Sequence, residues 1–397
     1  MPSIKITRKL VAVLLLVAVG FTFLAAGGAK VRAERGSRST AIDRCSPDLL
    51  QIVNSDPTRH VQAIVQSNSD SPELLDSLLQ LVGARILGSF PKLNARLVDV
   101  KASAAQVIAY DDNVSYMSLD NTIRPTGHVT ETTGTQQIRA ARNILGLSDQ
   151  LDGSGVTIAI VDSGIDTNHK SFATSGKIKA SKDFTGENRT DDPFGHGTHV
   201  AAIAAGLGTS TSGAYEGIAP GANLVNLRVL NSDGIGSVSG ILSALDWIMA
   251  NKALYNIKVV NMSLGADTIS QALDNAVKTL ADKGILFSIA AGNDAKLANL
   301  TSPARVNHVN VFTVSAVDSL GRFAKFSNYG NDVVDVAAPG VDIISTWIGS
   351  QYARLNGTSM AAPHVAGILV VKGKNFKTIG TALNDPDGTP DPIISFY

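Results

Sequence analysis

The sequence predicts an α/β protein in which a mostly parallel, doubly wound sheet follows a small α+β unit. From residue 156 to residue 316, short apolar runs alternate with stretches of helical spacing. Unbroken apolar runs are typical of strands covered on both faces, and regular alternation with helices supplies that cover. The expected strands are Val156–Val161, Asn223–Val229, Lys258–Met262, Ile285–Ala290 and Val311–Ala316, and the expected helices begin near His196, Gly240 and Ser270.

Residues 60–119 show a different pattern, in which strand-like and helical runs follow the order βαββαβ. This order is that of a small ferredoxin-like unit, and by itself it indicates no function. The expected strands are 61–65, 85–87, 95–100 and 114–117, and the expected helices are 72–81 and 102–109.

The composition is that of a packed globular protein. The chain has 397 residues, of which 44% are apolar and 17% charged, and Lys plus Arg equals Asp plus Glu at 34 each. This length suggests two or three segments, and the charge balance favours neither nucleic acid nor an acidic membrane surface as a partner. A single cysteine, Cys45, excludes an intramolecular disulfide, so the stability has to come from the core.

The N-terminus has the pattern of an export signal. Lys5, Arg8 and Lys9 precede an uncharged apolar run over residues 10–29. A basic start, an apolar middle and small residues at the exit are typical of a secretory signal peptide. The run is also long enough to span a bilayer, so an uncleaved anchor is the alternative. We expect residues 1–33 to be this signal and the rest to be secreted, periplasmic or otherwise extracytoplasmic.

Three stretches carry residues suited to nucleophilic catalysis. Asp162 ends the first predicted strand, His196 stands at the start of a small-residue helix, and Ser359 opens an Ala-rich helix. Each alone has an ordinary structural interpretation as a strand-end carboxylate, a helix cap or an N-capping serine. Together they supply a nucleophile, a base and a carboxylate that orients the base.

The chain from about residue 137 to about residue 368 resembles the subtilisin-like serine proteases, or subtilases, because four blocks of that family occur in the family's order. They are Val161-Asp162-Ser163-Gly164, Gly195-His196-Gly197-Thr198-His199, Ala290-Ala291-Gly292-Asn293 and Gly357-Thr358-Ser359-Met360-Ala361. The resemblance implies a subtilisin-like fold and a serine endopeptidase with the triad Asp162, His196 and Ser359. It also implies that Asn293 donates a hydrogen bond in the oxyanion hole.

The resemblance extends to substrate binding. A protease holds an extended peptide, and an added β-strand is the simplest way to do so. The family pattern implies that this strand lies between Gly234-Ile235-Gly236 and Ser263-Leu264-Gly265, with Ala290, Ala291 and Gly292 along the pocket for the side chain before the scissile bond. No carboxylate occurs in these stretches, so we expect an apolar or broad preference.

Placed before a subtilase domain, the ferredoxin-like unit resembles the family's propeptide, which assists folding, inhibits the enzyme and is then removed. We therefore expect a propeptide at residues 34–127 and a catalytic domain at residues 128–397. The polar, Thr- and Gly-rich stretch 121–134 is predicted to be a linker that contains the maturation cut or lies near it. Protein or peptide substrates and the chain's own propeptide are then the expected partners.

No cofactor is expected for the chemistry, and the metal ligands remain unknown. His199 could join His196 as a zinc ligand, but no HExxH frame or third ligand accompanies them, so His199 and His364 are interpreted as packed and hydrogen-bonded. Structural calcium is possible in this family. Ser171 stands where many relatives have an aspartate ligand, and the loop 207–216 has no Asn or Asp, so we expect no calcium there.

The C-terminal part departs from the family pattern. Lys372-Gly373-Lys374-Asn375 breaks the last helix early, and residues 378–383 and 392–396 can form a terminal hairpin. The Asp-rich turn 385–391 lacks the EF-hand spacing, so an Asx-type turn is the simpler interpretation.

A catalytic serine or a subtilisin-like fold also occurs in proteins with two other functions. A lipase or esterase is disfavoured, because Gly357-Thr358-Ser359-Met360-Ala361 is not a G-x-S-x-G elbow and the Asp-His-Ser order differs from that of lipases. A catalytically silent binding or inhibitory protein that keeps the subtilisin fold is the second alternative. The intact triad and Asn293 argue against it.

Overall fold

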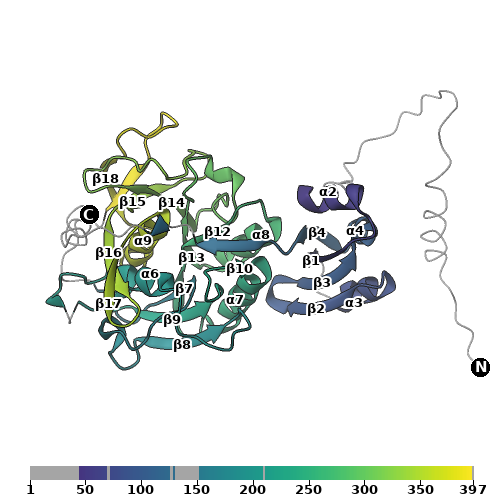
Figure 1. Cartoon of the computed structure of the whole chain (residues 1–397), viewed down its shortest axis with the longest axis horizontal. Helices are drawn as coiled ribbons and strands as arrows, with labels where there is room; N and C mark the ends of the chain where they lie inside the picture. The colour runs from purple at the N-terminus through teal and green to yellow at the C-terminus, as the bar shows by residue number, and fades with distance from the viewer. Residues whose placement is uncertain (1–43, 69–71, 126–127, 130–151, 209–210, 396–397) are drawn as a thin grey trace, which may run out of the picture. The chain divides into compact units, whose positions relative to one another are not determined.

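The computed structural model of the chain describes residues 44–68, 72–125, 128–129, 152–208 and 211–395. The described residues comprise an N-terminal unit, residues 44–119, and a larger α/β domain, residues 152–395 (Figure 1). The predicted signal segment, residues 1–33, lies outside the described residues. Within the described ranges, no helix is long and apolar enough to cross a membrane.

The N-terminal unit has the predicted βαββαβ order. Its four strands form an antiparallel sheet in the order β2-β3-β1-β4. The elements are α2 (Pro47–Ser55), β1 (His60–Ser67), α3 (Pro72–Leu81), β2 (Arg85–Phe90), the 3₁₀ helix η2 (Pro91–Leu93), β3 (Ala95–Lys101), α4 (Ala102–Ala109) and β4 (Val114–Leu119). Helix α2 was not predicted; it packs against α4 and β4 through the buried Leu49 and Val53.

The α/β domain is built on a nine-stranded sheet in the order β18-β19-β15-β14-β13-β11-β7-β9-β8. The seven strands from β15 to β8 are parallel to one another, which confirms the predicted mostly parallel sheet. They are β7 (Thr157–Asp162), β8 (Ile178–Asp183), β9 (Asn223–Arg228), β11 (Ile257–Met262), β13 (Leu286–Ala290), β14 (Val311–Val317) and β15 (Val336–Pro339).

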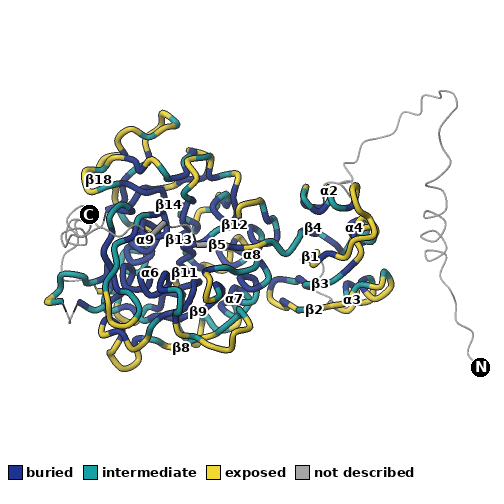
Figure 2. Tube along the Cα trace, in the orientation of Figure 1, coloured by how far each residue is buried: buried dark blue, intermediate teal, exposed yellow. Residues whose placement is uncertain are grey.

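Helices cover both faces of this sheet, as predicted. Helices α6 (His196–Ala205) and α9 (Thr358–Lys372) contact each other and share one apolar core with Ile158 and Val314. Helices α7 (Val238–Asn251) and α8 (Gln271–Asp282) pack in a second core. Figure 2 shows the central strands and α6 in the colour of buried residues. Small side chains let α6 and α9 lie deep in the domain, and all ten residues of α6 are buried.

Two small sheets lie beside the main one. In the first, β5 (Thr122–Pro125) lies between β10 (Gly236–Ser237) and β12 (Leu264–Ala266). In the second, β17 (Gln351–Asn356) lies between β6 (His128–Val129) and β16 (Ile343–Trp347). Residues 122–125 and 128–129 of the predicted linker 121–134 are therefore strands. They form backbone hydrogen bonds with strands of the α/β domain. The remaining short helices are η3 (Lys170–Phe172) and η5 (Ala298–Leu300).

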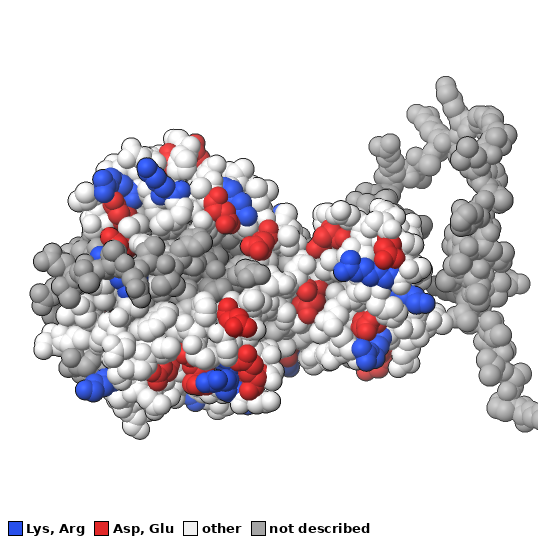
Figure 3. Space-filling model, in the orientation of Figure 1, with Lys and Arg blue, Asp and Glu red and all other residues white. Residues whose placement is uncertain are grey.

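The C-terminal residues form the predicted hairpin. Strand β18 (Lys377–Thr381) pairs antiparallel with β19 (Pro392–Ser395), and β19 joins the main sheet beside β15. The turn between them is an Asx-type turn, in which Asp391 N donates to Asp385 Oδ2 at 3.0 Å and Thr389 N donates to Asp387 Oδ1 at 2.9 Å. On the face shown in Figure 3, acidic and basic side chains are interspersed, in keeping with the formal net charge of zero.

Candidate active site

Asp162 stands at the end of β7, on the edge of the parallel sheet where the carboxyl ends of the strands meet. Its side chain is buried, with only 1% of the residue exposed. Oδ1 accepts hydrogen bonds from Ser163 N at 2.7 Å and from His196 Nδ1 at 2.7 Å. The first predicted pair of the triad is therefore in direct contact.

His196 is the first residue of α6. Gly195 before it has φ +92°, and a side chain at that position would overlap the ring of Trp347, so only glycine fits. Because a carboxylate only accepts, Nδ1 carries the hydrogen and Nε2 of the neutral ring is the basic atom. Among the described residues, Nε2 is buried with no hydrogen-bond partner.

The environment of His196 favours its charged form. Burial by itself lowers the pKa of the imidazole, but the charge of Asp162 and its hydrogen bond outweigh burial and raise the pKa above its ordinary 6.5. An imidazolium formed during a reaction is therefore stabilised where it arises. This is the electrostatic property that a general base needs in order to hold a proton.

Ser359 is the second residue of α9, and Gly357 is the residue before the helix. Its hydroxyl donates to the carbonyl of Ser263 at 2.9 Å, and the hydroxyl of Ser263 donates to the carbonyl of Ser359 at 2.8 Å. Ser263 directly follows β11, so this reciprocal pair ties the start of α9 to the edge of the sheet. The backbone N–H of Ser359 lies in the first turn of α9, at the end of the helix where the dipole favours an anion.

Asn293 follows β13 and faces the start of α9. Its Oδ1 accepts from the backbone N–H of Thr358 at 2.9 Å and from the hydroxyl of Thr358 at 3.0 Å. These two donors fix which end of the amide is oxygen, and the Nδ2 donor is buried with no hydrogen-bond partner in the described part of the chain. A buried donor without a partner beside the predicted nucleophile suits an anion that forms only during a reaction.

The predicted substrate-binding stretches border β5. Gly236 pairs with Ile123 in β10, while Leu264 and Gly265 pair with Pro125 and Arg124 in β12. Gly234 and Ile235 lie in the turn before β10. Both form backbone hydrogen bonds with Asn231, in which Gly234 N donates to Asn231 O and Asn231 N donates to Ile235 O. Neither residue therefore takes part in the pairing with β5. Ser263 contacts Ser359 instead of β5, because it lies before β12 begins.

The small residues predicted to line the specificity pocket are buried. Ala290 ends β13, and Ala291 and Gly292 follow it toward Asn293. Gly292 has φ +109°, and a side chain there would overlap the amide of Asn328. Asn328 donates to the carbonyl of Ala291 at 3.0 Å, so a packed loop supports this stretch from behind.

Two histidines have structural positions, as predicted. His199 Nε2 faces the carbonyl of Ala353 at 3.1 Å, and His364 Nδ1 faces the carbonyl of Met360 at 2.8 Å. Burial lowers the pKa of His199 to about 3 and that of His364 to about 4, so both rings are neutral. No group of three or more His, Cys, Asp or Glu side chains suited to a metal ion occurs among the described residues.

The residues that the sequence did not reveal form hydrogen bonds next to the triad. Asp192, Ser163 and Arg228 are all buried, and Ser163 contacts both of the others. A sequence signal for Asp192 exists, because an aspartate shortly before a helix is a common N-cap. The contact with Ser163 could not be read from the sequence, since the two residues lie 29 positions apart.

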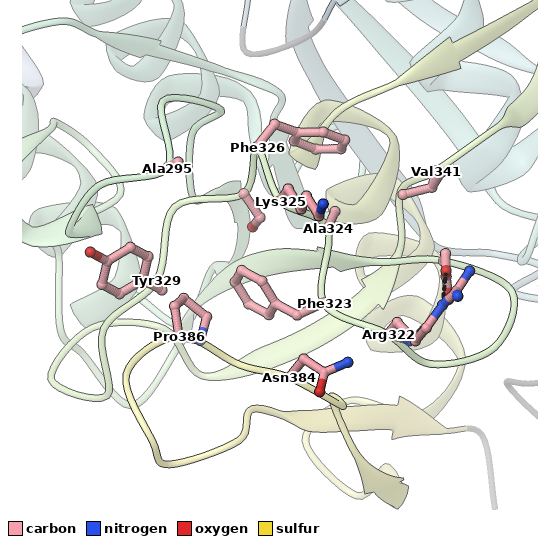
Figure 4. Close-up of a pocket in the computed structure, with 12 residues that line it drawn as sticks. Ala295, Arg322, Phe323, Ala324, Lys325, Phe326, Tyr329, Val341, Asn384 and Pro386 are labelled. Carbon is pink, nitrogen blue, oxygen red and sulfur yellow. Dashed lines mark hydrogen bonds and ion pairs between the residues drawn. The ribbon is translucent and has the colours of Figure 1, made fainter.

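A cavity of about 730 Å³ is lined by residues that do not include the triad (Figure 4). Phe323, Tyr329 and Pro386 line it, and Arg322 faces Asp318 in an ion pair at its edge. Ala295, two residues after Asn293, is its nearest connection to the active site by sequence. None of the predicted catalytic residues lines this cavity, so it is not part of the site described above.

Known proteins are similar to this chain in sequence. The Subtilase family matches residues 153–379, which is more than half of the chain. M-protease of Shouchella clausii is 36% identical over 314 residues, covering 78% of this chain and 77% of that protein. A cuticle-degrading serine protease of Arthrobotrys oligospora is 33% identical over 321 residues, covering 78% and 76%.

A solved structure gives the same result for the fold. The crystal structure of a cold adapted subtilisin-like serine proteinase matches with a TM-score of 0.55 and 34% identity, covering 63% of this chain and 92% of that chain. The family match at residues 153–379 lies within the α/β domain. The chain therefore belongs to the subtilase family and is a serine endopeptidase.

Proposed function

We propose that this serine endopeptidase acts through Asp162, His196 and Ser359, and that it is exported and made as a self-processing zymogen. The observation that carries the proposal is the buried 2.7 Å contact of His196 Nδ1 with Asp162, which leaves Nε2 as the basic atom. Helix α6, which His196 begins, packs on helix α9, which carries Ser359 near its start.

The proposed reaction has two stages. Ser359 Oγ attacks the carbonyl carbon of the peptide bond, and its proton passes to His196 Nε2. When the C–N bond breaks, His196 gives the proton to the leaving amine, and an acyl-enzyme remains on Ser359. Water then attacks the ester by the same route and restores the serine. Asp162 keeps the ring in the required tautomer and stabilises its charged form.

The proposed oxyanion hole consists of two donors. The Nδ2 group of Asn293 and the backbone N–H of Ser359 can both face the carbonyl oxygen as it becomes negative. Thr358 holds the other end of the Asn293 side chain with two hydrogen bonds, so the donor is preorganised. This saves the cost of orienting it during the reaction.

Incubation of the purified protein with casein, with and without a serine-directed acylating inhibitor, tests the activity. Hydrolysis that the inhibitor abolishes is the expected result. Absence of hydrolysis by the processed protein would favour the alternative of a catalytically silent binding or inhibitory protein.

The pH profile should show the titration of His196. Only the neutral ring accepts a proton, so kcat/KM is expected to fall on the acid side with one ionisation. Since Asp162 raises the pKa of His196, we expect the midpoint of this limb above 6.5. Measurement of kcat/KM on an uncharged peptide between about pH 4 and pH 9 checks this. A flat profile would contradict the assignment of His196 as the base.

Contacts of the N-terminal unit, and of Asp120 directly after it, with the α/β domain support a propeptide role. Asp120 accepts hydrogen bonds from Ser239 N at 2.7 Å and from Ser239 Oγ at 2.6 Å, in the first turn of α7. Gln66 on β1 accepts from Asn275 on α8 at 2.9 Å. A carboxylate at a helix N-terminus satisfies free N–H groups and interacts favourably with the helix dipole.

The chain leads from this unit into the region of Ser359. Strand β5 is held between β10 and β12, as a bound substrate strand would be, and ends at Pro125. Strand β6 begins at His128, which pairs with Asn356, three residues before Ser359. We infer that the maturation cut falls between Pro125 and His128. The released unit can then remain as an inhibitor, because its contacts with α7 and α8 do not depend on the cut bond.

The remaining parts of the proposal concern export and substrates. The basic and apolar pattern of residues 1–33 supports export by a signal peptide or a signal anchor. The buried small residues Ala290, Ala291 and Gly292 bring no charge to the proposed specificity pocket, which supports apolar or broad substrate preference.

We expect no calcium ion on the loop 207–216. Glu216 has the only carboxylate in this loop, and Ser171 supplies a hydroxyl where a carboxylate ligand would be needed. A hard cation needs several oxygen ligands, and charged ones contribute most of the affinity. A crystal structure determined from crystals grown with calcium checks this. An ion coordinated by the loop would show the expectation to be wrong.

A further inference from the structure

A second buried carboxylate, that of Asp192, lies against the backbone on either side of His196. Asp192 is 3% exposed, and both of its carboxyl oxygens are fully used. Oδ1 accepts from Ser163 Oγ at 2.8 Å and Gly195 N at 2.7 Å, while Oδ2 accepts from Thr198 N at 2.7 Å and Thr198 Oγ1 at 2.7 Å. Burial raises the pKa of Asp192, and the four donors oppose that shift by holding the ionised form.

These contacts surround His196 on both sides. Gly195 and Thr198 donate their backbone N–H groups to Asp192, and Gly197 donates its backbone N–H to Ser163 Oγ at 2.9 Å. Three backbone positions around His196 are therefore held by one hydrogen-bonded pair, Asp192 and Ser163. The first turn of a helix has no internal partners for its N–H groups, so this pair determines where the turn lies.

The same pair is joined to Asp162. Ser163 N donates to Asp162 Oδ1, the oxygen that also accepts from His196. The carbonyl of Ser163 accepts from Nε of Arg228, whose side chain is fully buried at the end of β9. The strand-end loop with Asp162 and the helix start with His196 are thus connected through Ser163 as one unit.

We propose that Asp192, acting through Ser163 and the first turn of α6, is a positioning residue that holds His196 in register with Asp162 and supplies a second negative charge to the imidazolium. This inference rests on the proposed function, in which His196 is the base. Catalytic groups displaced by about 1 Å can lose about 10²-fold in rate, so a support of this kind has a kinetic effect beyond stability.

The negative charge of Asp192 changes the pKa of His196 in a defined direction. The charge of Asp192 favours the protonated form of His196, as that of Asp162 does. Other titratable or charged groups near the pair, in the described residues, include His199 on α6 and the buried Arg228 on β9, which is itself paired with Asp183 and Glu187. Asp166 is joined to the network through its backbone N–H, which donates to Thr198 Oγ1. Loss of the Asp192 charge therefore lowers the pKa of His196 and moves the acid limb of kcat/KM to lower pH.

The variant Asp192→Asn tests the inference with little change in shape. Whichever way the amide is turned, its NH₂ group faces a backbone N–H, either that of Gly195 or that of Thr198. We expect kcat per active site to fall by about 10- to 100-fold with KM within about twofold, and the acid limb to shift to lower pH. Active sites are counted with a serine-directed acylating reagent, on the full chain after processing by its own activity or by a trace of wild-type enzyme.

Asp191→Asn is the matched control. It removes the same charge one residue away, but Asp191 is on the surface in an ion pair with Arg189. Wild-type kcat and pH profile are expected for this control. If Asp192→Asn keeps the wild-type kcat per active site and the wild-type acid limb, the inference is wrong, even where thermal stability falls.

Ser163→Ala carries the test if Asp192→Asn does not fold. It breaks the connection but keeps the Asp192 charge, so we expect kcat to fall by about threefold to tenfold without a shift of the acid limb. An unchanged kcat per active site would overturn the inference. Ser359→Ala separates the two hypotheses: full activity in that variant contradicts the proposed function, whereas its inactivity beside wild-type kinetics in Asp192→Asn and Ser163→Ala contradicts only the inference.

Discussion

Replacement of Ser359 by alanine is expected to leave the chain uncut, while the wild-type chain matures. Scaling the mass of 41.4 kDa by the 270 of 397 residues that follow Gly127 gives a mature form of about 28 kDa. Loss of the nucleophile costs about 10⁶ in kcat in subtilisin, where the effect is established, and we expect a loss of that order here.

The proposed self-cleavage needs no fast enzyme, because the bond to be cut belongs to the same chain. Strands β5 and β6 pair with the α/β domain on either side of the proposed cut, and a tethered bond reacts at a high effective concentration. Gel electrophoresis and N-terminal sequencing, after expression in a host without other subtilases, check the prediction. Ser319→Ala, a change at an exposed serine, is the control and should mature normally. Maturation of Ser359→Ala at the wild-type rate would mean that another protease makes the cut.

Much of the fold could be predicted because its signals are local. The bounds of α3 and α4 and the start of α6 follow from helical spacing and from small residues within single segments. The buried strands β7 and β11 follow from unbroken apolar runs. Helix α2 escaped prediction because its burial depends on α4 and β4, which lie far along the sequence.

The site was predictable only in part, for a related physical reason. Asp162, His196, Ser359 and Asn293 occur in blocks that carry their own sequence signal. The support by Asp192, Ser163 and Arg228 consists of side-chain contacts between separate elements, and such contacts become visible only when the elements are packed. The stretches around Gly236 and Leu264 were expected to border an added strand. That β5 occupies this position, with its register at Ile123 and Arg124, depends on backbone geometry that no local pattern specifies.

The variant Asn293→Ala is expected to lower kcat sharply while KM changes little. In the proposed oxyanion hole, the Nδ2 donor acts when the carbonyl oxygen becomes negative, so its loss raises the energy of the transition state more than that of the bound substrate. Removal of one oxyanion donor costs about 10²–10³ in kcat, a range established in subtilisin itself, and we expect the same range by analogy. The proposed self-processing depends on the same chemistry, so this variant is also expected to mature slowly.

Asn293→Asp separates the lost donor from lost packing. The aspartate keeps the oxygen that accepts from Thr358 N and Thr358 Oγ1, so the start of α9 remains in place. It replaces the Nδ2 donor by a second oxygen, which repels a developing oxyanion. We therefore expect a loss of kcat at least as large as in Asn293→Ala, with thermal stability closer to wild type. Steady-state kinetics per titrated active site and thermal unfolding of both variants provide the measurement. A near-wild-type kcat in Asn293→Asp would exclude Asn293 as an oxyanion donor, because that variant retains the contacts of the side chain and lacks only its hydrogen-bond donor and its neutrality.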